Sequence, residues 1–204
     1  MAGAVDGEVG FEELYAQAGE DLEAIPWASL TANPALREWL DGSPMGRGQT
    51  ALVVGCGLGD DAEELGRRGY RVVAFDISPS AIARCRQRFP DSTVDYRVAD
   101  LFAFSRDWRS AFDLVVEIRT LQSLPVNQRE DAARAIASVV RAGGRLFVRC
   151  LARGDDERLT ARPWPVSRGE LKAFAEGGLA ELEFREEKSP GGRARSFTVV
   201  YGRD

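Results

Sequence analysis

The chain of 204 residues, 44% hydrophobic and 29% charged, is long enough for one globular domain with a sizeable core. Its net charge of −5 argues against a nucleic-acid partner, and no stretch approaches the roughly 18 apolar residues that a membrane span needs. The chain has no histidine, which excludes Ser-His-Asp and Cys-His hydrolases and histidine-ligated zinc, so we expect no metal site.

The N-terminal residues 1–48 are predicted to form a tail and a helical lid. The first ten residues lack the basic end and apolar block of a signal peptide, and the three cysteines form no CxxC pair. Both features lead us to expect reduced thiols and a cytoplasmic protein. Apolar residues recur at helical spacing from Phe11 to Ala18, and Asn33-Pro34 is typical of the start of a helix over Ala35–Leu40.

Residues 49–204 are predicted to form the main domain, because strand-like and helix-like segments alternate from Thr50 onward. Strands that alternate with helices pair in parallel and are covered on both faces. The expected strands are 51–54, 72–75, 94–98, 112–118 and 146–151, and the expected helices are 60–68, 79–89 and 127–141, the last ended by Gly143-Gly144.

The C-terminal region breaks this alternation. Ser167 and Glu170 have the spacing of a capping box, which predicts a helix through about Glu176. Two further strands, 179–186 and 196–201, follow with only a turn containing Pro190-Gly-Gly192 between them, so they are expected to pair antiparallel. The predicted fold is α/β: a doubly wound, Rossmann-like, mostly parallel seven-stranded sheet that ends in an antiparallel hairpin.

A glycine loop follows the first strand of the domain. Gly55, Gly57 and Gly59 allow a sharp turn and a close approach to a ligand at a helix N-terminus. Asp76 ends the second strand, 21 positions after Gly55, where a carboxylate can accept both hydroxyl protons of a ribose. The alternatives are a tight turn without a ligand and an Asp76 that caps the helix beginning near Pro79. The glycine loop and Asp76 together favour a nucleoside-binding site.

Two nucleoside cofactors compete for this site. A dinucleotide loop has the pattern G-x-G-x-x-G, and its third glycine is replaced here by Asp60. An acid at that helix start repels a pyrophosphate, whereas S-adenosylmethionine carries no phosphate and has a positively charged sulfonium. S-adenosylmethionine is therefore the predicted cofactor. A nicotinamide-dependent oxidoreductase and a non-catalytic nucleoside-binding protein are the alternatives.

With these motifs, residues 50–201 resemble the class I S-adenosylmethionine-dependent methyltransferases. The matching segments are 53–59, the strand ending at Asp76-Ile77-Ser78, 99–102, 112–117 and 141–147. The resemblance implies that the acid at the second motif holds the ribose, that the next residue packs on adenine and that the third motif binds the adenine amino group. The implied cofactor-binding residues are Trp27, Gly55, Cys56, Gly57, Asp76, Ile77, Asp100, Leu101, Phe102 and Glu117.

Within this family, the chain is similar to the thiopurine and thiol/halide methyltransferase branch. Val53 stands where many members carry an acid, and Gly55-Cys56-Gly57 follows it. Pro26-Trp27 in the lid segment and the stretch 162–167 also resemble that branch. The resemblance implies a small-molecule acceptor, with a thiol or another soft nucleophile as the favoured kind, and the sequence does not indicate an oligomeric state.

Methyl transfer from a sulfonium is an in-line displacement that needs orientation and a dry pocket more than acid–base groups. A thiolate needs no base, whereas a phenol or alcohol acceptor would need a carboxylate. Glu117 is the catalytic candidate; alternatively, it organises the loop 118–124. The candidates for the acceptor pocket are Tyr15, Trp27, Arg119 and Trp164, with a buried anchor as the leading alternative for Tyr15 and neutralisation of Glu117 as an equal alternative for Arg119.

Overall fold

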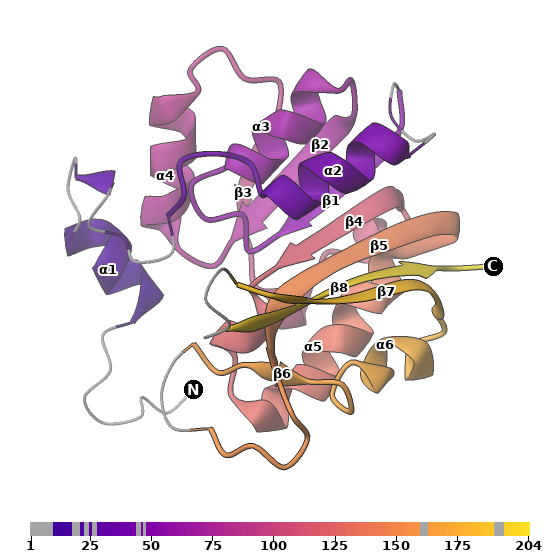
Figure 1. Cartoon of the computed structure of the whole chain (residues 1–204). Coiled ribbons are helices and arrows are strands. Elements are labelled where there is room, and N and C mark those ends of the chain that lie inside the picture. Colours follow the sequence, from indigo (N-terminus) through magenta and orange to yellow (C-terminus); the bar gives the residue numbers. More distant parts are fainter. Residues whose placement is uncertain are drawn as a thin grey trace.

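The computed structural model describes residues 10–17, 21–22, 25, 28–43, 46, 48–159, 163–189 and 194–204. It has one twisted sheet with helices on both faces (Figure 1). The strands are β1 (Thr50–Val54), β2 (Arg71–Asp76), β3 (Asp95–Val98), β4 (Phe112–Ile118), β5 (Val140–Arg153), β6 (Val166–Ser167), β7 (Ala180–Lys188) and β8 (Arg195–Gly202). The helices are α1 (Phe11–Gln17), α2 (Pro34–Gly42), α3 (Asp60–Arg67), α4 (Pro79–Arg88), α5 (Val126–Val139) and α6 (Lys172–Glu176), with 3₁₀ turns η2 (Leu101–Ala103), η3 (Arg106–Trp108) and η4 (Leu121–Ser123).

The sheet confirms the predicted fold class. Its strand order is β3-β2-β1-β4-β5-β8-β7, in which β1 to β5 pair in parallel and β8 and β7 pair antiparallel at one end. From β1 the chain adds β2 and β3 on one side of the sheet, and it then returns to add β4 and β5 on the other side of β1. The order in which strands are added therefore reverses between β1 and β4. Ligands of open α/β sheets bind at such a switch point, beyond the carboxyl ends of the strands.

The two-residue strand β6 was not predicted. It pairs in parallel with the end of β5. The predicted capping box does form beside it, since the Ser167 amide donates to Glu170 Oε2 (2.7 Å) and the Glu170 amide donates to Ser167 Oγ (3.3 Å). The residues directly after it form turns, however, and α6 begins only at Lys172. The capping signal was correct, but the predicted helix is shorter because Ser167 also belongs to the sheet.

The glycines Gly143-Gly144 lie inside β5 and not at the end of a helix. Helix α5 ends at Val139 and the strand begins at Val140. The pairing of β5 with β4 shifts register around the glycines, and Gly143 has a positive φ of 74°. A Cβ at Gly144 would lie 2.9 Å from the Phe112 carbonyl oxygen. The pair therefore forms a bulge that needs small residues.

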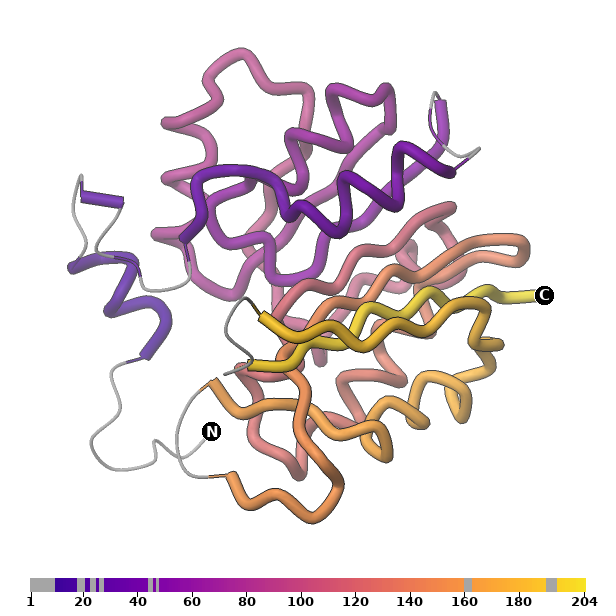
Figure 2. The backbone as a smooth tube through the Cα atoms, in the orientation of Figure 1, coloured from indigo at the N-terminus to yellow at the C-terminus, as the bar shows by residue number. Residues whose placement is uncertain are grey.

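Two buried apolar layers fix the sheet between its helices. Helices α5 and α6 pack on one face, and α2, α3 and α4 pack on the other (Figures 1 and 2). Trp39 packs on Phe147 and Trp108 packs among Phe75, Phe104 and Phe112, as expected of packing residues. Because α2 belongs to a core layer, α1 is the described helix of the predicted lid segment that remains outside the two layers.

The N-caps of two helices follow the predicted pattern. Asn33 Oδ1 accepts from the Ala35 amide at the start of α2, and Ser78 Oγ accepts from the Ala81 amide at the start of α4. The described helices are all too short or too polar to cross a bilayer. The predicted tail over residues 1–9, Trp27 and the turn Pro190-Gly-Gly192 lie outside the described residues.

Candidate active site

The glycine loop lies where two neighbouring strands end. β1 and β4 are parallel partners with Val54 opposite Glu117, so the loops that follow them meet at one edge. Gly55 and Gly57 have φ values of 58° and 53°. A Cβ at Gly55 would lie 2.5 Å from Thr120 Oγ1, and one at Gly57 would lie 3.0 Å from the Tyr15 hydroxyl. The loop therefore has two independent reasons for glycine: its backbone conformation and the neighbours packed against it.

Asp76 is the residue that fixes the glycine loop. Its side chain is 7% exposed at the end of β2. Oδ2 accepts from the Gly57 amide and Oδ1 accepts from the Ser78 amide, both at 3.0 Å. Since Ser78 and not Asp76 caps α4, the capping alternative is wrong. A carboxylate has about four acceptor positions, so Asp76 can accept further hydrogen bonds beside those of the Gly57, Ser78 and Ile77 amides.

Exposed apolar side chains lie next to Asp76. Ile77 follows it and is 60% exposed, and Phe102 in the turn after β3 is 47% exposed. Asp100 is exposed and accepts from the Phe102 amide at 2.8 Å, whereas Leu101 is buried in the core. Exposed apolar side chains at the carboxyl end of a parallel sheet are a surface that a ligand can cover.

Asp60 and Asp61 have different environments at the start of α3. Asp60 forms an ion pair with Arg88 at 2.8 Å, so its negative charge is compensated within the chain. Asp61 accepts from the Asn33 amide at 2.7 Å, and burial raises its pKa to about 6. The charge argument against a pyrophosphate therefore depends on Asp61, and its contact with Asn33 joins two segments that are distant in the sequence.

Glu117 lies fully inside the protein, with 0% of its surface exposed. Its Oε1 accepts from the amides of Thr120 (2.7 Å) and Leu121 (3.0 Å). Its Oε2 has no hydrogen-bond partner among the described residues, and burial raises the pKa of Glu117 to about 7. These contacts are those of a residue that organises the loop after β4. The general-base role remains a prediction.

The loop that Glu117 holds reaches back to the glycine loop. Thr120 Oγ1 donates to the Val54 carbonyl at 3.1 Å. Arg119, exposed and with a φ of 67°, donates its amide to the Arg149 carbonyl. The cation that opposes the rise in the pKa of Glu117 is Arg129, whereas Arg119 acts on Asp61. Thr120 is therefore a residue of the candidate site that no motif indicated.

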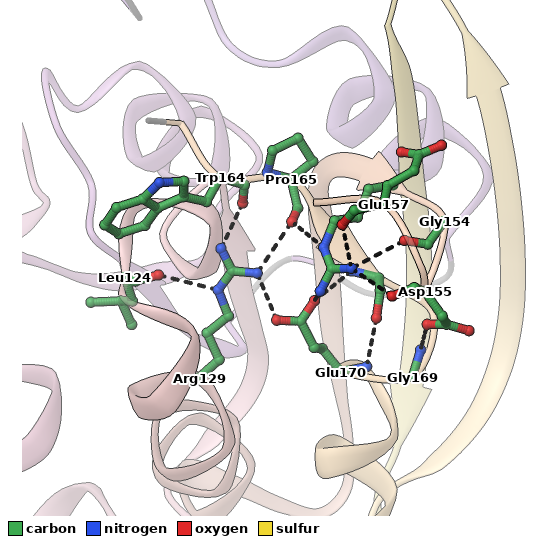
Figure 3. Close-up of polar contacts among 11 residues, drawn as sticks. Leu124, Arg129, Gly154, Asp155, Glu157, Trp164, Pro165, Gly169 and Glu170 are labelled. Carbon is green, nitrogen blue, oxygen red and sulfur yellow. Dashed lines mark hydrogen bonds and ion pairs between the residues drawn. The ribbon is translucent and has the colours of Figure 1, made fainter. Parts of the chain in front are cut away.

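A buried network of arginines holds the segment around Trp164 (Figure 3). Arg129 of α5 donates to the carbonyls of Leu124 (3.2 Å), Trp164 (2.6 Å) and Pro165 (3.2 Å), and pairs with Glu170 Oε1 at 2.7 Å. The Trp164 amide in turn donates to the Gln122 carbonyl at 2.8 Å. The backbone of Trp164 is thus held from both sides, beside the turn η4 that follows β4.

Arg153 extends this network along the end of β5. It pairs with Glu170 Oε2 at 2.7 Å and donates to the carbonyls of Pro165 and Asp155 (Figure 3). Glu170 thereby joins two guanidinium groups, and Asp155 lies exposed with its carboxylate on the Gly169 amide. The network was missed from the sequence because its members lie on separate elements and depend on tertiary folding.

The remaining predicted residues are Tyr15 of α1, Cys56 of the glycine loop and Trp27. Tyr15 is buried with Leu58 and Ala81, which agrees with the anchor alternative. The Cys85 thiol, together with burial, raises the pKa of Cys56 well above its usual range, so the site does not activate this thiol as a nucleophile. Trp27 lies outside the described residues.

The described residues thus form an α/β fold with a candidate ligand site at the strand ends. Residues 51–144 match the family described as "Methyltransferase domain". The ubiquinone biosynthesis O-methyltransferase of Pseudomonas paraeruginosa is 30% identical over 131 residues, which are 63% of this chain and 56% of that relative. This chain therefore spans a little over half of that relative's length.

Solved structures share the fold. The N-methyltransferase NodS of Bradyrhizobium japonicum, in complex with S-adenosylhomocysteine, has a TM-score of 0.72 and 21% identity and covers 93% of this chain and 96% of its own. The 1,6-didemethyltoxoflavin N1-methyltransferase of Burkholderia thailandensis has a TM-score of 0.72 and 18% identity and covers 98% of this chain and 94% of its own. Residues 51–144, a little under half of the chain, are thus similar to a methyltransferase domain, and the chain shares its fold with two methyltransferases whose structures hold S-adenosylhomocysteine.

Glu117→Gln is expected to flatten the pH dependence of stability. The pKa of Glu117 is about 7 when folded against an ordinary value of 4.5, so the folded state holds a proton that the unfolded state releases, and wild-type stability falls as pH rises between about 5 and 8. Glutamine retains the acceptor for the two loop amides without the buried charge. Thermal unfolding across this pH range measures the effect, and equal slopes for the two proteins would contradict it.

Arg129→Leu is expected to destabilise the domain by about 3–5 kcal/mol, because Glu170 and three carbonyls lose a buried partner. Arg134→Leu on the same helix is the control, since Arg134 is exposed and a surface ion pair contributes only about 0–1 kcal/mol. Urea unfolding followed by circular dichroism compares the two variants. Equal stability of both would show that the network does not hold the Trp164 segment.

Proposed function

We propose that this chain transfers the methyl group of S-adenosylmethionine to a small-molecule acceptor. The observation that carries the proposal is Asp76, whose buried carboxylate is fixed by the Gly57 and Ser78 amides beside exposed Ile77. In this proposal Asp76 accepts from both ribose hydroxyls. Ile77 and Phe102 cover the adenine, and Asp100 accepts from its amino group.

The glycine loop fits the methionine portion of this cofactor. Gly55 and Gly57 supply the positive φ values that this tight turn needs, and in this proposal Cys56 packs beside the ligand. When bound, the cofactor supplies an activated methyl group on a sulfonium. In this proposal the carboxylates of Asp61 and Asp76, on either side of the loop, favour a cationic ligand over a pyrophosphate.

For the acceptor side we propose a wall made of Trp164 and Arg119, with Tyr15 and Trp27 on the side of the lid segment 1–48. Arg119 can attract an anionic acceptor, and the Trp164 ring can lie against a flat one. Of the two roles considered for Glu117, its burial supports positioning of the loop 119–121. An acceptor that arrives as a thiolate or another soft nucleophile then needs no base, as the resemblance to the thiol/halide branch implies.

The curated relative is by its name an O-methyltransferase, which supports a phenol or alcohol acceptor as the second candidate. Turnover of S-adenosylmethionine with matched thiols, phenols and amines separates the candidates. We expect methylation of thiols with rates that follow the thiolate fraction. Methylation of phenols alone would instead support an O-methyltransferase. Cofactor binding without turnover of any acceptor on a broad panel would favour a nucleoside-binding protein without catalysis.

Asp76→Ala is expected to weaken binding of S-adenosylhomocysteine at least about tenfold, because charge-assisted hydrogen bonds worth about 1.5–3 kcal/mol are lost. Asp91→Ala, an exposed acid after α4, is the control and should bind like the wild type. Isothermal titration calorimetry with S-adenosylhomocysteine and with NAD measures both. Binding of NAD alone by the wild type would replace the proposal with a nicotinamide-dependent oxidoreductase.

Trp164→Ala is expected to raise the KM for a flat acceptor roughly three- to tenfold, because an aromatic pair contributes about 0.5–1.5 kcal/mol. The affinity for S-adenosylhomocysteine should stay unchanged, since Asp76 and the glycine loop are untouched. Trp164→Phe should retain most of the effect of the ring. Steady-state kinetics of the three proteins test this, and an unchanged KM in Trp164→Ala would remove Trp164 from the acceptor wall.

A further inference from the structure

Helix α1 lies beside the start of α4, outside the two layers of helices (Figures 1 and 2). One acidic side chain makes the polar part of this contact. The Glu12 carboxylate accepts from the hydroxyls of Ser78 (2.5 Å) and Ser80 (2.6 Å) and from the Ser80 amide (3.2 Å). An acid of one helix is therefore bound at the N-terminus of another.

The N-terminus of α4 is well suited to hold this carboxylate. The first amides of a helix are donors without an intrahelical partner, and the helix dipole favours negative charge there. Ser78 uses its hydroxyl oxygen to cap the Ala81 amide, so its hydroxyl proton is available to Glu12. The hydroxyls of Ser78 and Ser80 lower the pKa of Glu12, which keeps it ionised at neutral pH.

The same contact reaches the ribose acid and the glycine loop. Ser78 donates its amide to Asp76 and its hydroxyl to Glu12, so one residue joins the candidate ribose site to α1. Three residues after Glu12, Tyr15 is buried against Leu58 and Ala81. Its hydroxyl lies 3.0 Å from the position that a Cβ on Gly57 would take. Helix α1 thus covers the loop that a nucleoside cofactor must approach.

Helix α1 depends on these contacts for its position. It has seven residues, and isolated helices shorter than about 12–15 residues are marginal in water. Glu12 fixes the helix by hydrogen bonds to α4 and its cap, and Tyr15 fixes it by apolar packing. Both side chains contact residues at the start of α4 or next to the glycine loop.

We propose that Glu12 is the latch of a gate over the cofactor site, holding α1 closed on the glycine loop and setting how fast the cofactor enters and leaves. This inference rests on the proposed function for the identity of the ligand. In this proposal the latch is closed both with and without ligand, so it stabilises both states alike and changes rates more than affinity. Loss of a binding residue such as Asp76 would instead weaken the affinity.

The test compares Glu12→Ala with Glu13→Ala, the neighbouring acid, whose carboxylate contacts the Gly10 amide of its own segment. Stopped-flow binding and displacement of S-adenosylhomocysteine give both rate constants. We expect Glu12→Ala to raise association and release by at least about fivefold each, with Kd within about threefold of the wild type. Unchanged rates, or a higher Kd with unchanged association, would overturn the latch.

Ser80→Ala removes the hydroxyl that donates to Glu12, from the other side of the same contact. If Glu12 acts through Ser80, the double variant Glu12→Ala/Ser80→Ala should release the ligand as fast as Glu12→Ala alone. Effects that multiply in the double variant would show that the two residues act separately, and would contradict the latch.

Hydrogen exchange of the free protein separates failure of the latch from failure of the proposed function. The amides of α1 should exchange faster in Glu12→Ala than in Glu13→Ala, whether or not S-adenosylhomocysteine binds. Equal exchange in both variants would overturn the latch even if the cofactor binds. Absence of binding to the wild type, with α1 exchanging faster in Glu12→Ala, would overturn the proposed ligand and leave the latch supported.

Discussion

The site depends on one carboxylate and the two amides that it accepts from. Asp76 receives the Gly57 amide from the glycine loop and the Ser78 amide from the turn into α4, so it fixes both segments that a nucleoside would contact. Through Ser78 it is also connected to Glu12 and thus to α1. Strand order explains why these segments meet: β2 pairs with β1, and both end at the edge where the topology reverses.

The electrostatics of this edge explain how a protein without histidine can serve such a site. Burial raises the pKa of Asp61 to about 6 and that of Glu117 to about 7, and it also raises the pKa of Asp76. A cationic ligand would favour the charged forms of these acids and lower their pKa values again. In the proposed function the sulfonium of S-adenosylmethionine would meet this condition and would supply the activation itself, so these acids would bind and position the ligand without relaying protons.

Much of the fold was predictable because it depends on local patterns. The apolar run Phe112–Ile118 matches β4 at both ends, and Asn33 and Ser78 cap their helices through side chains that favour this role. The nucleoside motif was also visible, since Gly55 and Asp76 lie at the ends of adjacent strands. The Gly143-Gly144 bulge was predicted as a turn because glycine indicates conformational freedom without specifying how the chain uses it.

The parts that were not predictable depend on contacts between distant segments. Thr120 becomes a site residue only because the loop after β4 folds onto Gly55, and Arg129 meets Trp164 and Glu170 only after α5 and the segment before α6 have packed. Glu117 was identified as a carboxylate at the right strand end, but the sequence did not show that its side chain is buried.

A crystal structure of the wild-type chain with S-adenosylhomocysteine tests the central claim most directly. The account predicts both ribose hydroxyls on the Asp76 carboxylate, adenine against Ile77 and Phe102, and α1 closed over the glycine loop. A ribose bound elsewhere, with the Asp76 carboxylate contacting only the Gly57 and Ser78 amides, would contradict it.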